Sequence, residues 1–340
     1  MDKSNTAAIA PSRRRVVIGS GAFALGIIAA RFVLRMGAAR AAFPDRPVRI
    51  VVANTPGGPS DIMARIIAAA LQQATGGTFI VENKPGGGTN IGMGLVARAE
   101  PDGYTLLLAT STFAVNPGLY NSLPYDPLKD FVPICELATS PNVFGVKPTL
   151  GAKTMKEFVA LAKASPEKFN ISTPPIGTTP QLEAEVLKLR EGLTKVASVP
   201  FPGGGDAVQA LLSGTVQIAS VVLAPAHPHI KAGAITGLAV TGSKRWHDLP
   251  DIPTMLEAGY PDFVFETYTA LLAPAKTPPE IVKTLEKTCL EILGRPEMRD
   301  KLVQAGFEVQ AKSGADHMAR VVKEIPMFRD IIAQAGIQRL

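Results

Sequence analysis

The feature of this sequence that most restricts its fold is a repeated alternation of short apolar runs with amphipathic helical segments, which starts near residue 47. Residues 48–53 are apolar apart from Arg49, as a buried strand requires. In residues 61–74 apolar side chains recur at helical spacing, and Gly76 and Gly77 follow as a stop signal. This alternation is typical of a layered α/β protein with mainly parallel sheets.

The alternation continues through two blocks of similar size and ends in a helical stretch. A chain of 340 residues can form two lobes, each with its own core. Residues 138–141 and 263–269 lack helix signals, and we expect the chain to cross between the lobes there. The sequence therefore predicts a bilobal α/β fold joined by crossover strands. Lobe one comprises residues 42–140 and 268–340, and lobe two comprises residues 141–267.

Basic residues are concentrated in the first 41 residues. This segment holds seven Lys or Arg and one Asp out of 35 basic and 29 acidic residues, which leaves 28 of each in the remainder. With equal numbers of basic and acidic residues, the rest of the chain has no excess of positive charge with which to bind nucleic-acid phosphates. We therefore expect no nucleic-acid partner.

Residues 1–41 have the form of an export signal. Three arginines at 13–15 precede an apolar stretch, residues 16–30, and a small-x-small cleavage site ends at Ala41. Paired arginines favour twin-arginine export, with a general secretory signal as the alternative. Arg31 and Arg35 interrupt the apolar run before the ~20 residues that a membrane span needs. We expect cleavage near Ala41 and a periplasmic mature protein.

No pattern in the sequence indicates catalysis or a metal site. Residues 42–340 contain neither a G-x-S-x-G elbow nor an H-E-x-x-H motif. His227 and His229 have no carboxylate or cysteine nearby in sequence. Cys135 and Cys289 could pair in an oxidising compartment, but their apolar surroundings favour two buried free thiols. We expect no enzyme activity, no metal and no cofactor.

Two glycine-rich turns each join a predicted strand to a predicted helix. The first contains Gly57, Gly58 and Asp61, with Asp61 as the expected N-cap, and the second contains Gly88 and Asn90. Such a turn exposes backbone N–H groups at the positive end of a helix dipole and can hold an anion, although a capped turn without a ligand is the alternative. After adjacent parallel strands, the two turns would lie side by side where open α/β sheets bind ligands. Neither turn reads G-x-G-x-x-G, and no G-K-[ST] phosphate loop is present.

Two further segments place polar side chains after predicted strands. Ser111 and Thr112 follow the third strand. Thr178, Thr179 and Gln181 lie in a proline-rich segment that begins a helix in the second block. Both segments could contact a ligand, and for the second a proline-stiffened loop without a ligand is the alternative.

Short motifs occur in order from residue 43 to the C-terminal helices. They include Thr55-Pro56-Gly57-Gly58, Glu82-Asn83-Lys84-Pro85-Gly86, Pro101-Asp102-Gly103-Tyr104, Asn116-Pro117-Gly118-Leu119-Tyr120, Leu123-Pro124-Tyr125-Asp126-Pro127 and Leu249-Pro250-Asp251-Ile252-Pro253-Thr254. Together these motifs resemble those of the extracytoplasmic receptors of tripartite tricarboxylate transporters, the Bug family.

The resemblance implies a Venus-flytrap fold without catalysis, in which main-chain amides hold a carboxylate. It assigns the cradle in lobe one to Gly57, Gly58, Asp61, Gly88 and Asn90. It also implies that side chains from the facing loops reach the ligand, namely Ser111, Thr178, Thr179 and Gln181.

The sequence departs from the family pattern at several of these positions. Asn54 stands where an aromatic residue is usual, Phe113 and Gln181 stand where histidine is common, and Val221 replaces a frequent acid. The last three departures replace polar or charged side chains that could pair with a ligand. They argue against a multiply charged, citrate-like ligand, because a buried charge needs a partner. Phe113 and Val221 would suit a ligand with an apolar or aromatic body and one carboxylate.

The sequence therefore predicts a periplasmic solute-binding protein that closes its lobes on a small carboxylate ligand and presents it to membrane transporter subunits. We expect the protein to be a monomer. The alternatives are a binding component of another importer, a ligand-sensing receptor and, less favoured, a periplasmic enzyme on a similar bilobal fold.

Overall fold

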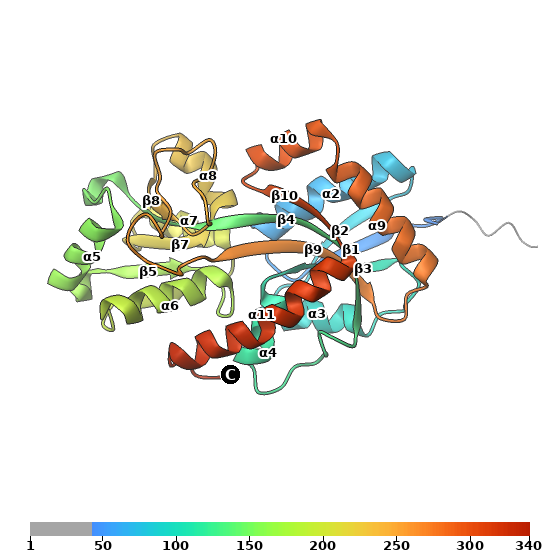
Figure 1. The fold of residues 1–340 in the computed structure, drawn as a ribbon, viewed down its shortest axis with the longest axis horizontal. Helices are drawn as coiled ribbons and strands as arrows, with labels where there is room; N and C mark the ends of the chain where they lie inside the picture. Colours follow the sequence, from blue (N-terminus) through green and yellow to red (C-terminus); the bar gives the residue numbers. More distant parts are fainter. Residues whose placement is uncertain (1–42) are drawn as a thin grey trace, which may run out of the picture. The chain divides into compact units, whose positions relative to one another are not determined.

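The computed structural model describes residues 43–340, and the predicted export signal lies outside these residues. The fold is α/β, as predicted (Figure 1). The strands are β1 (Val48–Val52), β2 (Phe79–Asn83), β3 (Thr105–Thr110), β4 (Phe131–Val146), β5 (Asn170–Thr173), β6 (Ala197–Pro200), β7 (Ile218–Val222), β8 (Thr236–Val240), β9 (Glu266–Pro274) and β10 (Glu308–Ser313). The helices are α2 (Pro59–Thr75), α3 (Asn90–Ala97), α4 (Thr112–Leu119), α5 (Met155–Ala164), α6 (Thr179–Glu191), α7 (Gly204–Ser213), α8 (Leu223–Lys231), α9 (Pro279–Leu293), α10 (Pro296–Gln304) and α11 (Gly314–Gln334).

The strands form a mixed sheet in the order β2-β1-β3-β9-β4-β7-β5-β6, with β8 and β10 also paired to β4. The outer strands run parallel in two sets, β2-β1-β3 and β6-β5-β7. Strand β4 pairs with β9 as far as Pro141 and with β7 from Asn142 onward. The sheet therefore has two halves that share β4. The first half holds β1, β2, β3, β9 and β10, and the second holds β5 to β8.

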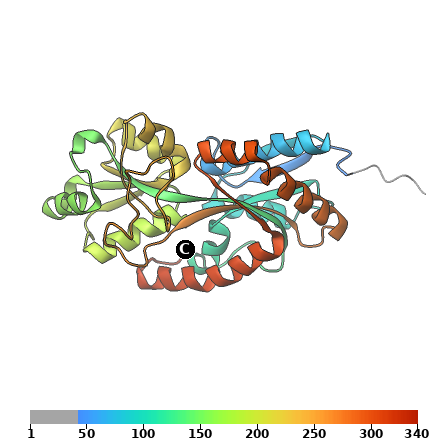
Figure 2. The same ribbon diagram turned by 45° about the horizontal axis from the view of Figure 1, so that its top comes forward.

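Helices cover both faces of each half, because the central strands are buried on both sides. In β3, Leu106 and Leu108 pack into a core with α2, α9 and α10, whereas Leu107 and Ala109 pack with α3, α4 and α11. Figure 2 shows α11 on the opposite side of the sheet from α2 and α9. In the second half, α5 and α6 cover one core and α7 and α8 cover the other.

The long central strands differ from the sequence prediction. The sequence indicated an extended crossover at residues 138–141, but not that one strand would run through it: β4 begins at Phe131 and continues for 16 residues. Irregular pairing with β9 between Pro133 and Cys135, and again between Glu136 and Ala138, interrupts the regular alternation that would have indicated one strand.

Cys135 and Cys289 are free and buried in the same core, which confirms the sequence prediction. Burial raises the pKa of the Cys289 thiol to about 12, so this thiol stays protonated at neutral pH. No helix between residues 43 and 340 combines the length and the apolar character that a membrane span requires.

A buried ionic cluster joins α11 to the central strands of the first half. Glu136 of β4 is fully buried, and it accepts hydrogen bonds from His317 Nδ1 at 3.0 Å and Arg320 Nη1 at 2.9 Å. Burial alone would raise the pKa of Glu136, but the hydrogen bond from His317 and the charge of Arg320 lower it to about 2. Tyr268 of β9 packs against His317, and its backbone N–H donates to Ser111 Oγ at 3.0 Å. The cluster thus connects α11 with the start of α4.

Replacing Glu136 with alanine should lower the free energy of unfolding by about 3 to 5 kcal/mol, because the change leaves the partners of a buried ion pair uncompensated. Urea unfolding followed by circular dichroism measures this loss. Glu291→Ala is the matched control, since Glu291 is exposed and pairs with Lys287 only at 3.8 Å. Its effect should stay below about 0.5 kcal/mol. Equal losses in the two variants would contradict a stabilising role for the cluster.

Candidate functional site

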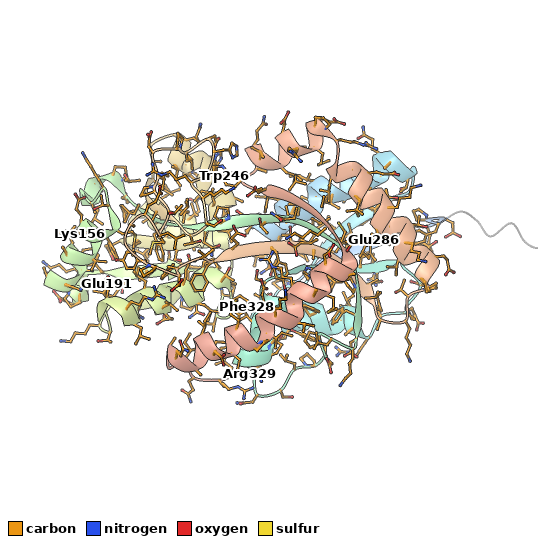
Figure 3. All side chains as sticks on the ribbon, viewed as in Figure 1. Lys156, Glu191, Trp246, Glu286, Phe328 and Arg329 are labelled. Atoms are coloured by element: carbon orange, nitrogen blue, oxygen red, sulfur yellow. The ribbon has the colours of Figure 1, made fainter. Side chains whose placement is uncertain are left out.

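Four helices begin at the junction between the two halves, each after the carboxyl end of a strand. Helices α2 and α4 follow β1 and β3 in the first half, and α6 and α7 follow β5 and β6 in the second. Their first residues, Pro59, Thr112, Thr179 and Gly204, line one cavity of about 40 Å³. Figure 3 places Glu191, the last residue of α6, at the outer end of its half, so the N-terminal end of α6 points toward the first half.

The four helix starts make the cavity attractive to anions. None of them has a side-chain cap, so first-turn N–H groups are available to a ligand. The positive ends of the helix dipoles face the same space. The residues that line it are uncharged: Asn54, Thr55, Gly58, Pro59, Ser60, Thr110, Ser111, Thr112, Pro174, Pro175, Thr178, Thr179, Pro180, Gly203, Gly204, Val222 and Thr267. Amides and hydroxyls, rather than lysine or arginine, would therefore hold a negative group here.

The first glycine turn contributes to the cavity, although Asp61 has a different position from the one predicted. Gly58, not Asp61, is the N-cap of α2 and lines the cavity. Asp61 lies in the first helical turn, where its carboxylate accepts from Gly57 N–H at 3.0 Å and from two nitrogens of Arg65. Burial alone would raise the pKa of Asp61, but the hydrogen bonds from Arg65 and Gly57 lower it. Gly57 and Asp61 thus shape the turn without lining the cavity.

The second glycine turn is not part of the cavity wall. Asn116 Nδ2 of α4 donates to Gly88 O at 2.9 Å and to Asn90 Oδ1 at 2.7 Å, and the Tyr125 hydroxyl also donates to Asn90 Oδ1. A Cβ on Gly88 would overlap the Tyr120 hydroxyl. The polar groups of this turn therefore form hydrogen bonds within the first half, and Gly88 and Asn90 are not among the residues that line the cavity with Gly58.

Polar side chains predicted after the third strand and at the start of α6 do come together. Ser111, Thr112, Thr178 and Thr179 line the cavity from opposite halves. Gln181 lies behind them, where its Oε1 accepts from Gly177 N–H at 3.2 Å and fixes the loop before α6.

Phe113 and Val221 lie in cores rather than in the cavity wall, so their positions do not support the ligand preference inferred from them. Phe113 is fully buried and packs against Tyr125 and Phe131. Val221 is 1% exposed and belongs to the core under α7 and α8. Neither side chain is among the residues that line the cavity.

Sequence reasoning missed several lining residues. Gly203 and Gly204 form a strand–glycine–helix junction like the first turn, and this pattern could have identified them. Thr267 stands on β9 beside Asn142 of β4, and only the tertiary structure brings it to the cavity.

The two halves touch around the cavity. Thr55 Oγ1 donates to Pro202 O at 3.5 Å, and a Cβ on Gly203 would overlap Thr55 Oγ1. A Cβ on Gly177 would lie 2.8 Å from Leu119 Cδ2 of α4. Glycine at these two positions lets the halves approach closely without displacing the opposite side chain. Within residues 43–340, no group of three or more His, Cys, Asp or Glu side chains is arranged to hold a metal ion.

Comparison with known proteins agrees with this architecture. Residues 63–337 match the family described as "Tripartite tricarboxylate transporter family receptor". BugT of Bordetella pertussis is 31% identical over 296 residues, which cover 86% of this chain and 90% of BugT.

Solved structures are also similar in fold to this chain. The periplasmic binding protein BugD aligns with a TM-score of 0.84 at 31% identity, over 88% of this chain and 100% of BugD. Rpa4515 of Rhodopseudomonas palustris, solved with adipate, aligns with a TM-score of 0.84 at 33% identity, over 88% of this chain and 100% of Rpa4515. MatC of the same species, with bound malate, gives 0.80 at 30% identity, over 85% of this chain and 100% of MatC.

These matches confirm the predicted bilobal binding-protein fold and the predicted family. The chain belongs to the receptor family of tripartite tricarboxylate transporters, the Bug family, whose members are periplasmic solute-binding proteins.

Proposed function

We propose that this protein captures a small aliphatic carboxylate between its halves and presents it to the membrane subunits of a tripartite tricarboxylate transporter. The observation that carries the proposal is the cavity on which four uncapped helix N-termini converge. The adipate and malate in two structurally similar proteins support a carboxylate. The proposed role is binding without turnover, by a monomer.

The cavity wall favours a ligand with polar substituents besides its carboxylate over one with an apolar ring, because hydroxyls line it on both sides. A carboxylate would accept from first-turn amides, and the threonine and serine hydroxyls would contact its polar substituents.

We further propose that residues 42–140 with 268–340, and residues 141–267, act as two lobes that close on the ligand. The change of partners along β4 between Pro141 and Asn142 supports this division. The membrane subunits of the transporter would then recognise the closed, ligand-bound form and not the open form. Residues 1–41 would direct export to the periplasm and be removed near Ala41.

Malate and adipate should raise the melting temperature of the purified protein, whereas the neutral amide adipamide should not, because the cavity favours negative charge. At about 100 times the dissociation constant, a ligand adds about 2.7 kcal/mol to the free energy of unfolding, which thermal-shift assays detect readily. Benzoate should give a smaller shift than the aliphatic acids. The proposal fails if no mono-, di- or tricarboxylate stabilises the protein.

Gly203→Ala should weaken carboxylate binding about tenfold, equivalent to about 1.4 kcal/mol, because its Cβ overlaps Thr55 Oγ1 when the halves meet. Isothermal titration with malate or adipate measures the change. Adding Thr55→Ala should restore part of the affinity by removing the obstructing hydroxyl. Gly205→Ala is the matched control, since its Cβ would meet only Gly57 O at 3.6 Å. Equal affinities for Gly203→Ala and Gly205→Ala would rule out the proposed close approach.

A further inference from the structure

Glu183 of α6 is a buried carboxyl group with only neutral partners. Its side chain is fully buried, Oε2 accepts from Asn142 Nδ2 at 2.8 Å, and Oε1 lies 2.7 Å from Ser220 Oγ. Among the ion pairs of residues 43–340, none includes Glu183. This environment differs from that of Glu136, which has His317 and Arg320 as partners.

The contacts of Ser220 indicate which group carries the proton. Ser220 Oγ lies 2.8 Å from Pro180 O and 2.7 Å from Glu183 Oε1, but it has a single proton to donate. A backbone carbonyl only accepts. Both short contacts are satisfied when Ser220 donates to Pro180 O and a protonated Glu183 donates to Ser220.

A short chain of hydrogen bonds connects Glu183 to the cavity wall. Asn142 donates to Glu183 through Nδ2 and accepts from Thr267 Oγ1 at 3.1 Å through Oδ1. Thr267 Oγ1 lies 2.6 Å from Thr179 Oγ1, and both threonines line the cavity. Glu183 therefore fixes the amide that orients two ligand-facing hydroxyls.

We propose that Glu183 is a positioning residue that acts as an uncharged carboxylic acid behind the cavity, and that its ionisation weakens anion binding. This inference rests on the proposed function, because it requires an anionic ligand. No charged side chain lines the cavity to offset a second negative charge. An ionised Glu183 would repel a bound carboxylate through a low-dielectric interior, where such repulsion is strong.

The neighbours of Glu183 agree with a neutral form at physiological pH. Burial raises the pKa of Glu183 to about 8, and hydrogen bonds from Asn142, Ser220 and Thr241 offset only part of that rise. These residues face it from β4, from β7 and from the position after β8, and none of them titrates near neutral pH. Because a bound anion favours the neutral acid, affinity is constant below the pKa of the free protein and falls as pH rises through it.

Isothermal titration of the full chain with malate and with adipate, between about pH 6.5 and 9.5, tests the proposal. The dissociation constant should be flat up to about pH 7.5 and then rise, by at most about tenfold per pH unit. Glu183→Gln should remove this rise and keep the affinity measured at low pH, because glutamine stays neutral and can donate to Ser220 and accept from Asn142. Glu185→Gln, on the same helix beside Lys188, is the matched control and should keep the wild-type profile.

A second measurement on the wild-type protein does not depend on the folding of a variant. Titrations near pH 8.5 in buffers of different ionisation enthalpy should show uptake of a fraction of a proton, up to about one per ligand, and none near pH 6.5. Flat affinity and no proton uptake, with malate or adipate still bound, would overturn the role of Glu183 and leave the proposed function intact. Failure of every carboxylate to bind at any pH would instead overturn the proposed function.

Discussion

The proposed carboxylate site depends on one electrostatic constraint: without cations, several backbone dipoles have to be aimed at one point to hold an anion. A single helix start contributes only a fraction of a charge, and water screens it. Here α2, α4, α6 and α7 begin around the same small cavity, and no lysine or arginine lines it. Parallel strands make this possible, because each strand–helix unit ends its strand and begins its helix at the same edge of the sheet. The mixed sheet then brings two such edges face to face.

Close approach of the two edges explains the residues found between the helix starts. Glycines at 177 and 203 stand where a Cβ would meet the opposite half, so the sequence there is restricted by contact between halves as well as by turn geometry. The residues of the cavity wall are also fixed by contacts on the side away from the cavity. Ser111 accepts from the backbone of Tyr268, which packs against His317 in the ionic cluster around Glu136. The contacts of the ionic cluster in the first half thus help to position Ser111 in the cavity wall.

Local sequence signals predicted the α/β class, the family and part of the cavity, because neighbouring residues encode strand ends, helix starts and short motifs. The first glycine turn identified Gly58, and polar side chains after predicted strands identified Ser111, Thr112, Thr178 and Thr179; all five line the cavity. Phe113 was misplaced because a single apolar residue after a strand can face a ligand or a core, and only its packing on Tyr125 and Phe131 decides. Thr267 could not be found at all, since its role comes from the pairing of β9 with β4.

The two halves use buried carboxyl groups in opposite ways, and the difference follows from their neighbours. Glu136 meets His317 and Arg320, so ionisation stabilises it and it can anchor a structural cluster. Glu183 meets only amide and hydroxyl groups, so a charge there would lack compensation. A cation beside Glu183 would offset that charge, but the pair would then place two buried charges, with their desolvation cost, behind the hydroxyls that face the cavity. A neutral acid can form hydrogen bonds with Asn142 and Ser220 without burying a charge, which makes it compatible with the proposed anion site, where backbone dipoles alone would attract the ligand.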